Sequence, residues 1–138
     1  MYRFLSFSLA AAAAVLMASC GASTDCHKGD SCTCAGQGAC TWNCVDSGCA
    51  FSADGQGATT LTCDKGGCSL TANGQGDVSF DCAGGNCTVT SNGQGTVNLS
   101  CAGGGCSSSC AGNETCNTTK CPSCKCDATE LTATCNVQ

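Results

Sequence analysis

The sequence has little of what usually builds an apolar globular core or a catalytic centre. Of its 138 residues only 4% are aromatic and 11% charged, with one proline and one histidine. Four Phe, one Tyr and one Trp cannot fill a large aromatic core, so a globule of that kind is excluded. A formal net charge of −5 with five Lys and Arg argues against a nucleic-acid binder, which needs clustered basic residues.

Cysteine and glycine are abundant instead, with 19 of each. Cysteine this dense in a short chain is typical of a disulfide scaffold. With the cysteines engaged in bridges and only His27 available as a base, we expect the protein not to be an enzyme. An odd number of cysteines indicates that one of them has another use.

The N-terminus has the pattern of an export signal. Arg3 precedes an apolar run that is too short to span a membrane, and the run ends in Leu-Met-Ala-Ser-Cys at residues 16–20. This ending resembles the bacterial lipobox, in which a cysteine is lipidated and becomes the new N-terminus. The resemblance implies a signal peptide at 1–19, a covalent lipid on Cys20 and retention in the bacterial envelope, at the outer membrane. The alternative is an ordinary signal peptide cleaved near Ala18 or Ser19.

A period of 19 residues organises the rest of the chain. Gly-Gln-Gly triplets recur with this spacing around Gln37, Gln56, Gln75 and Gln94. Cysteines recur in two columns with the same spacing: Cys44, Cys63, Cys82 and Cys101, and Cys49, Cys68, Cys87 and Cys106. A fixed period of about 20 residues is typical of a solenoid.

Each repeat predicts two short strands and two turns. In the unit from Cys68 to Cys87, apolar and polar residues alternate on both sides of the Gly-Gln-Gly turn, which is the pattern of half-buried strands. We therefore expect an all-β, disulfide-stapled β-solenoid with two facing parallel sheets over residues 32–106. The inward positions, which would form its core, are Trp42, Phe51, Leu61, Leu70, Phe80, Val89 and Leu99.

The Cys-x4-Cys spacing places two inward cysteines on either side of a tight turn. We predict one bridge per turn, namely Cys44–Cys49, Cys63–Cys68, Cys82–Cys87 and Cys101–Cys106. Bonding along a column, between neighbouring coils, is the alternative that the sequence leaves open. We also expect the four glutamines to stack as an amide ladder that fixes the register, with flanking glycines that allow a positive φ.

Both ends depart from the repeat. We expect residues 20–31 to be a lipidated tether and residues 107–138 to be an irregular cysteine-rich cap. The pairing of the end cysteines cannot be assigned from the sequence: Cys26, Cys32, Cys34, Cys40, Cys110, Cys116, Cys121, Cys124, Cys126 and Cys135.

Two short cysteine motifs suggest other chemistry. The run Cys121-Pro-Ser-Cys124-Lys-Cys126 and the pair Cys32-Thr-Cys34 have spacings that hold zinc or a soft metal in cytosolic proteins. Behind a signal peptide they belong to disulfides, so we expect no metal and no cofactor beyond the lipid. A metal- or redox-active thiol protein is the alternative.

These features predict a non-catalytic envelope lipoprotein that serves as a rigid structural, adhesion or assembly module. It resembles the repeat-rich, cysteine-rich surface lipoproteins of Gram-negative bacteria. The expected partners are the membrane, a protein or another surface, or further copies along the solenoid axis, and no nucleic acid. The outward Thr88-Val-Thr90 also resembles the arrays of ice-binding β-solenoids, which leaves ice binding as a remote alternative.

Overall fold

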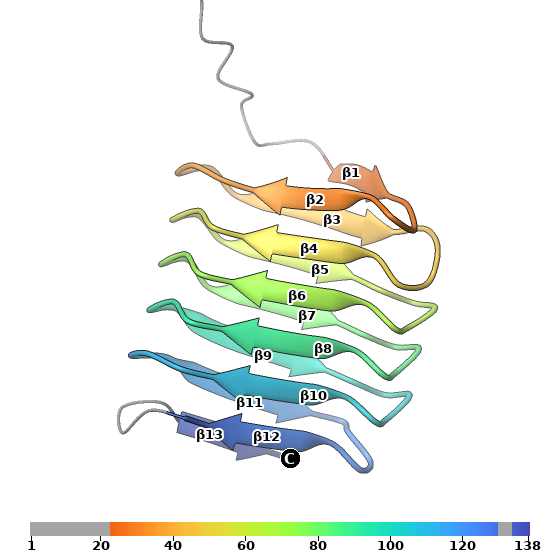
Figure 1. Ribbon diagram of the computed structural model, residues 1–138, viewed down its shortest axis with the longest axis vertical. Helices are drawn as coiled ribbons and strands as arrows, with labels where there is room; N and C mark the ends of the chain where they lie inside the picture. The colour runs from red at the N-terminus through yellow and green to blue at the C-terminus, as the bar shows by residue number, and fades with distance from the viewer. Residues whose placement is uncertain (1–22, 130–133) are drawn as a thin grey trace, which may run out of the picture.

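The protein is a stack of β-coils, which a computed structural model describes over residues 23–129 and 134–138 (Figure 1). One face is a seven-stranded sheet of β1 (Ser23–Cys26), β3 (Cys40–Cys44), β5 (Thr59–Thr62), β7 (Val78–Asp81), β9 (Thr96–Ser100), β11 (Thr115–Thr119) and β13 (Thr134–Val137). The other is a six-stranded sheet of β2 (Ser31–Cys34), β4 (Ala50–Ala53), β6 (Ser69–Ala72), β8 (Thr88–Ser91), β10 (Ser107–Cys110) and β12 (Lys125–Ala128). The chain alternates between the sheets, and neighbours within each sheet run parallel. The predicted all-β solenoid is confirmed.

The core lies between the two sheets and follows the 19-residue register. Phe51 pairs with Leu70, and Leu70 with Val89, along the six-stranded sheet. The facing column is Trp42, Leu61, Phe80 and Leu99. All of these side chains are buried except Trp42, which is half-buried in the first coils. The rings of Phe51 and Phe80 meet edge to face, with centroids 6.1 Å apart, so the two sheets are in direct contact.

The solenoid extends beyond the predicted bounds of 32–106 at both ends. Strand β1 lies in the expected tether, and β10 to β13 lie in the expected cap, where they continue both sheets. The end coils are one residue shorter, because Ser23 pairs with Thr41 and Ser107 with Lys125, 18 residues apart. At β1 and β12 this change breaks the visible period without breaking the stack. Strands β10, β11 and β13 keep the 19-residue pairing, but the Gly-Gln-Gly triplet is absent there and β10 and β11 carry Ser108 and Thr118 at inward positions. The expectation of an irregular cap was therefore wrong.

From the second Gly-Gln-Gly turn onward, the glycines are needed for close stacking rather than for a positive φ. A Cβ on Gly74 would overlap the carbonyl oxygen of Gly55 one coil away, and a Cβ on Gly55 would lie 2.7 Å from that of Gly36. Gly55 and Gly74 are not among the positive-φ glycines. Positive φ is found at the cysteine-closed turns, as at Gly66 and Gly85, and at Gly36 in the first Gly-Gln-Gly turn.

The core becomes polar toward the C-terminus. The column of Phe51 and Val89 continues with Ser108, and the column of Leu99 continues with Thr118. Their buried hydroxyl oxygens lie 3.2 Å apart and form a hydrogen bond. In the last coil Val137, which pairs with buried Thr118, is 50% exposed, and Ala128, which pairs with buried Cys110, is exposed too. Burial therefore stabilises the last coil least.

Over the two described ranges, no helix has the length and apolar character needed to cross a bilayer.

Candidate functional site

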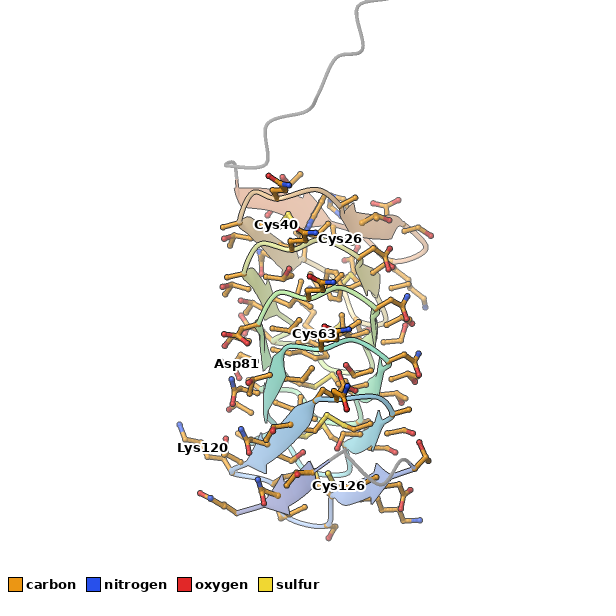
Figure 2. All side chains as sticks on the ribbon, turned by 90° about the vertical axis from the view of Figure 1, so that its left-hand side faces the viewer. Cys26, Cys40, Cys63, Asp81, Lys120 and Cys126 are labelled. Carbon is orange, nitrogen blue, oxygen red and sulfur yellow. A yellow bond between two sulfur atoms is a disulfide. The ribbon has the colours of Figure 1, made fainter. Side chains whose placement is uncertain are left out.

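A column of disulfides closes the coils along one edge of the solenoid. Six bridges follow one another at the turns from the seven-stranded to the six-stranded sheet: Cys26–Cys32, Cys44–Cys49, Cys63–Cys68, Cys82–Cys87, Cys101–Cys106 and Cys121–Cys124. We call these six bridges the sulfur column. In Figure 2 Cys63 lies between the two sheets, whereas Asp81 and Lys120 project outward.

The structure contains all four bridges expected from the repeat. Their Cα–Cα distances run from 5.9 to 6.5 Å, within the usual range for a disulfide. Every bridge described joins residues three to six positions apart in the sequence, so none runs along a column between coils. The cysteines of the four repeat bridges are at most 3% exposed.

Two further bridges close the opposite turns near the two ends. Cys34–Cys40 lies at the first Gly-Gln-Gly turn, and Cys110–Cys116 lies where a later coil has lost that triplet. Cys126 is also disulfide-bonded, through a partner outside the described side chains. No cysteine is free within the described part of the chain.

The two metal-like motifs are divided among different bridges. Cys32 and Cys34 of the Cys-x-Cys pair belong to separate disulfides. In the C-terminal motif Cys121 pairs with Cys124 and leaves Cys126 to another bridge. The four sulfurs that do come together are those of Cys101, Cys106, Cys121 and Cys124, all within 4.8 Å of one another. Sequence reasoning missed this group because its members come from adjacent coils.

The outer surface of the six-stranded sheet is a flat, uncharged array over five strands. Side chains alternate in and out along each strand, and parallel in-register pairing lines up the outward ones in two columns. From β2 to β10 these are Ser31, Thr33, Ala50, Ser52, Ser69, Thr71, Thr88, Thr90, Ser107 and Ser109. We call this surface the hydroxyl face.

The seven-stranded sheet presents a different surface. Its outward positions include the carboxylates Asp25 and Asp81, which interrupt the hydroxyls and amides. Thr60 and Thr62 form an outward Thr pair there that sequence reasoning did not consider. The two faces of the solenoid are therefore chemically distinct.

Asparagines, not glutamines, form the side-chain ladders. Asn117 Nδ2 donates to Asn98 Oδ1 at 2.9 Å, and Asn136 Nδ2 donates to Asn117 Oδ1 at 2.9 Å. The four glutamine side chains are exposed, and no side-chain hydrogen bond joins them among the described residues. The glutamine turns are joined through the backbone, as in the bond from Gln75 N–H to the Gly55 carbonyl at 3.1 Å. A short amide side chain on a strand lies directly above the equivalent side chain one coil away, so the two can form a hydrogen bond. A glutamine at an exposed turn is not held in this way.

A second ladder runs beside the Gly-Gln-Gly turns. Asn92 Nδ2 donates to Asn73 Oδ1 at 3.3 Å, and Asn73 Nδ2 donates to Asp54 Oδ1 at 2.9 Å. Ser52 Oγ donates to Asp54 Oδ2 at 2.6 Å. These hydrogen bonds, that from Ser52 first, lower the pKa of Asp54 below its ordinary value of 3.8 because they stabilise the ionised carboxylate.

The one histidine lies at an exposed turn of the first coil. His27 Nδ1 is 3.3 Å from Asp46 Oδ2, and the backbone N–H of Lys28 donates to the same oxygen. The Lys28 bond and then the His27 bond lower the pKa of Asp46. Both side chains are exposed, so this contact joins one turn to the next but stabilises the fold little.

Glu114 is a buried carboxyl that the sequence pattern did not single out. It is 3% exposed beside the Cys110–Cys116 bridge, and one carboxyl oxygen is hydrogen-bonded to Ser91 Oγ. Its other oxygen, Oε1, is buried without a partner. In the sequence, only the position of Glu114 in the turn that replaces the Gly-Gln-Gly triplet could have pointed to it.

No protein-family model, curated protein or solved structure matches this chain.

The Asp54 ladder makes stability depend on pH in a defined direction. The carboxylate has a lower pKa in the folded chain, so its contribution is present above the unfolded pKa and is lost as the pH falls through the folded pKa. We expect the free energy of unfolding to fall below about pH 4, the ordinary range of Asp. Asp54→Asn should flatten part of this fall, as measured by denaturant unfolding between pH 6 and pH 2 with the disulfides intact.

The matched control is Asp64→Asn, which removes an exposed carboxylate that accepts no described hydrogen bond. It should leave the fall in the free energy of unfolding at low pH unchanged. Equal flattening by both variants would show that general charge, and not the ladder, sets the pH dependence.

Proposed function

We propose that the protein is a non-catalytic, lipid-anchored module of the bacterial envelope that presents a rigid hydroxyl face to a hydroxyl-rich surface. The observation that carries this proposal is the uncharged face formed by β2, β4, β6, β8 and β10. The lipobox resemblance at residues 16–20 supports the location, and it lies outside the described residues. The bridges support rigidity, since each one closes a tight turn.

The anchor would hold the solenoid close to the membrane. Strand β1 begins at Ser23, three residues after Cys20, so a lipid on Cys20 is at most about 11 Å of extended chain from the first coil. Strand β1 lies inside the segment 20–31 that was expected to be a tether, so the connection from Cys20 to the stack is shorter than expected. The N-terminal end of the stack would face the bilayer, and the C-terminal end would project from it (Figure 1).

The hydroxyl face suits adhesion through many weak, regular contacts. Outward side chains repeat at about 4.8 Å between strands and at about 6.6 Å along a strand. Hydroxyl groups both donate and accept hydrogen bonds, so such a lattice can match an uncharged polymer with repeated hydroxyls. Rigidity lowers the entropy lost on binding, because the face is already ordered before the partner arrives.

Ice is a second candidate for the occupant of this face. Thr88 and Thr90 lie side by side on the sheet, between the mixed pair Ser69 and Thr71 of β6 and the two serines of β10. A regular, uncharged array of hydroxyl groups could also match the lattice of an ice surface. The two candidates share the same face and differ in the ligand.

The anchor can be tested by expressing the full chain in a Gram-negative host. We expect the protein in the membrane fraction, with an intact mass that shows residues 1–19 removed and acyl groups added. Cys20→Ser should remove the acylation and release the chain from the membrane, because one lipid-bearing residue provides the attachment. A wild-type chain that is cleaved but soluble and unacylated would contradict the anchor and favour an ordinary signal peptide.

The hydroxyl face can be tested with two double lysine variants, one on each sheet. Thr71→Lys/Thr90→Lys should weaken binding to an insoluble neutral glucan by about tenfold or more, because the lysines must be desolvated at the contact. The matched pair Thr60→Lys/Ser79→Lys, outward on the seven-stranded sheet, should leave binding unchanged. Equal loss from both pairs, or no glucan binding by the parent, would contradict the adhesion proposal. Thermal hysteresis of the parent, abolished by the first pair alone, would assign the face to ice.

A further inference from the structure

The C-terminal end of the sulfur column brings four cysteine sulfurs into one cluster. Cys101 and Cys106 close the turn between β9 and β10, and Cys121 and Cys124 close the turn between β11 and β12. Their four Sγ atoms all lie within 4.8 Å of one another. Elsewhere in the described chain the comparable cysteine groups contain only three sulfurs, or two sulfurs and Glu114.

A shortened turn produces this cluster. Thr119 pairs with Ser100 19 residues away, but Lys125 pairs with Ser107 only 18 residues away. Lys120 stands at the position of Cys101, so the first cysteine comes one residue later, and one residue is missing before β12. Together these two changes convert the Cys-x4-Cys turn of the repeat into Cys-x2-Cys. The Pro122 carbonyl accepts a hydrogen bond from Gly105 N–H at 3.2 Å, which holds the short turn directly against the one before it.

The two bridges of the cluster differ in access to solvent. Cys101 is 0% and Cys106 is 2% exposed, whereas Cys121 and Cys124 are only partly buried. The last coil is also the least apolar of the stack. A reductant therefore reaches Cys121–Cys124 before the buried bridges, since attack on a disulfide requires access to its sulfur.

We propose that these four cysteines form a redox-gated binding site for a thiophilic cation, with Zn²⁺ as the preferred ion. The reductant is a small dithiol. Its thiolate breaks the Cys121–Cys124 bond, and a released thiolate of that pair attacks the adjacent Cys101–Cys106 bond. Two dithiol molecules together supply four electrons and four protons, so that two S–S bonds break and two oxidised reductant disulfides form. Zn²⁺ then replaces the four thiol protons.

The geometry fits tetrahedral coordination by four thiolates. At a Zn–S distance of about 2.3 Å, the sulfurs of such a site lie about 3.8 Å apart, which the present spacing reaches with small side-chain movements. The backbone N–H of Cys87 donates to Cys106 Sγ at 3.3 Å, and bonds of this kind stabilise a thiolate. Lys120 and Lys125 flank the Cys-x2-Cys turn in the chain and offset the negative charge of a four-thiolate site.

The site is independent of the proposed surface role, because none of its cysteines lies on the hydroxyl face. It differs from the metal motif that the sequence suggested: Cys126 is replaced by Cys101 and Cys106 from the preceding turn. An oxidised chain holds the site closed, and a partly reduced chain opens it. The structure thus assigns metal binding to one redox state of one end of the solenoid.

Limited anaerobic reduction of the oxidised protein with dithiothreitol, followed by titration with Co²⁺, tests the proposal. Alkylation and peptide mass mapping should find new thiols at Cys121 and Cys124, and at the equally accessible Cys126, before those at Cys101 and Cys106. At that stage we expect one equivalent of Co²⁺ with the absorption of a tetrahedral thiolate complex, displaced by one equivalent of Zn²⁺. The fully oxidised protein should bind none.

Two double variants separate the site from cysteine content in general. Cys121→Ser/Cys124→Ser should abolish the cobalt spectrum, and circular dichroism of the oxidised variant checks that its fold is retained. Cys34→Ser/Cys40→Ser removes the bridge at the opposite turn and the opposite end, and should bind cobalt as the parent does. First reduction at one of the fully buried bridges, four thiols at the named positions without cobalt binding, or equal binding by both variants would each overturn the proposal.

Discussion

Covalent closure of a coil at one corner is the constraint on which the rest of this structure depends. Each coil places few large apolar side chains between the sheets, such as Phe80 on one side and Leu70 on the other. A core that thin offsets only part of the entropy lost when a whole coil is ordered. A bridge across a turn of this length contributes about 2 kcal/mol by restricting the unfolded chain. Repeated at successive turns, the bridges become a continuous structural element, comparable in extent to the sheets themselves.

Close backbone stacking is the second requirement, and it explains the glycine content. Turns that lie directly on one another leave no room for a Cβ, as at Gly55 and Gly74. The outward surface then follows with little freedom, because every strand repeats the same alternation in the same register. Short polar side chains line up in columns, as amide ladders on one sheet and as an uncharged hydroxyl array on the other. A scaffold of this kind makes a regular surface as a direct result of how it folds.

The sequence predicted the fold well where the period is unbroken. The cysteine columns, the inward positions from Phe51 to Leu99 and the two parallel sheets all follow from alternation within a 19-residue repeat. Prediction failed where the signal depended on a shift of one residue: the strands β1 and β12 were hidden in a presumed tether and cap. The glutamine ladder failed for a different reason, since the turn glycines are required by backbone contact and leave the glutamine side chains in solvent.

The candidate sites were less accessible from the sequence than the fold. The four-sulfur cluster joins cysteines whose proximity depends on the shortened turn before Lys125, and that turn can be recognised only once the strand register is known. Buried Glu114 has no periodic partner that would single it out. The hydroxyl face was visible as polar outward positions, but its lack of charge over five strands became clear only when the two sheets were separated.

The central claim is that the disulfides are necessary for the solenoid, and complete reduction tests it most directly. All bridges would be reduced under denaturant and alkylated, and the chain would be returned to native buffer beside an oxidised sample treated in the same way. Far-ultraviolet circular dichroism should show loss of the β spectrum in the reduced chain and full recovery in the oxidised one. A native-like spectrum after complete reduction would contradict the account, because the thin core and the backbone ladders would then suffice without the bridges.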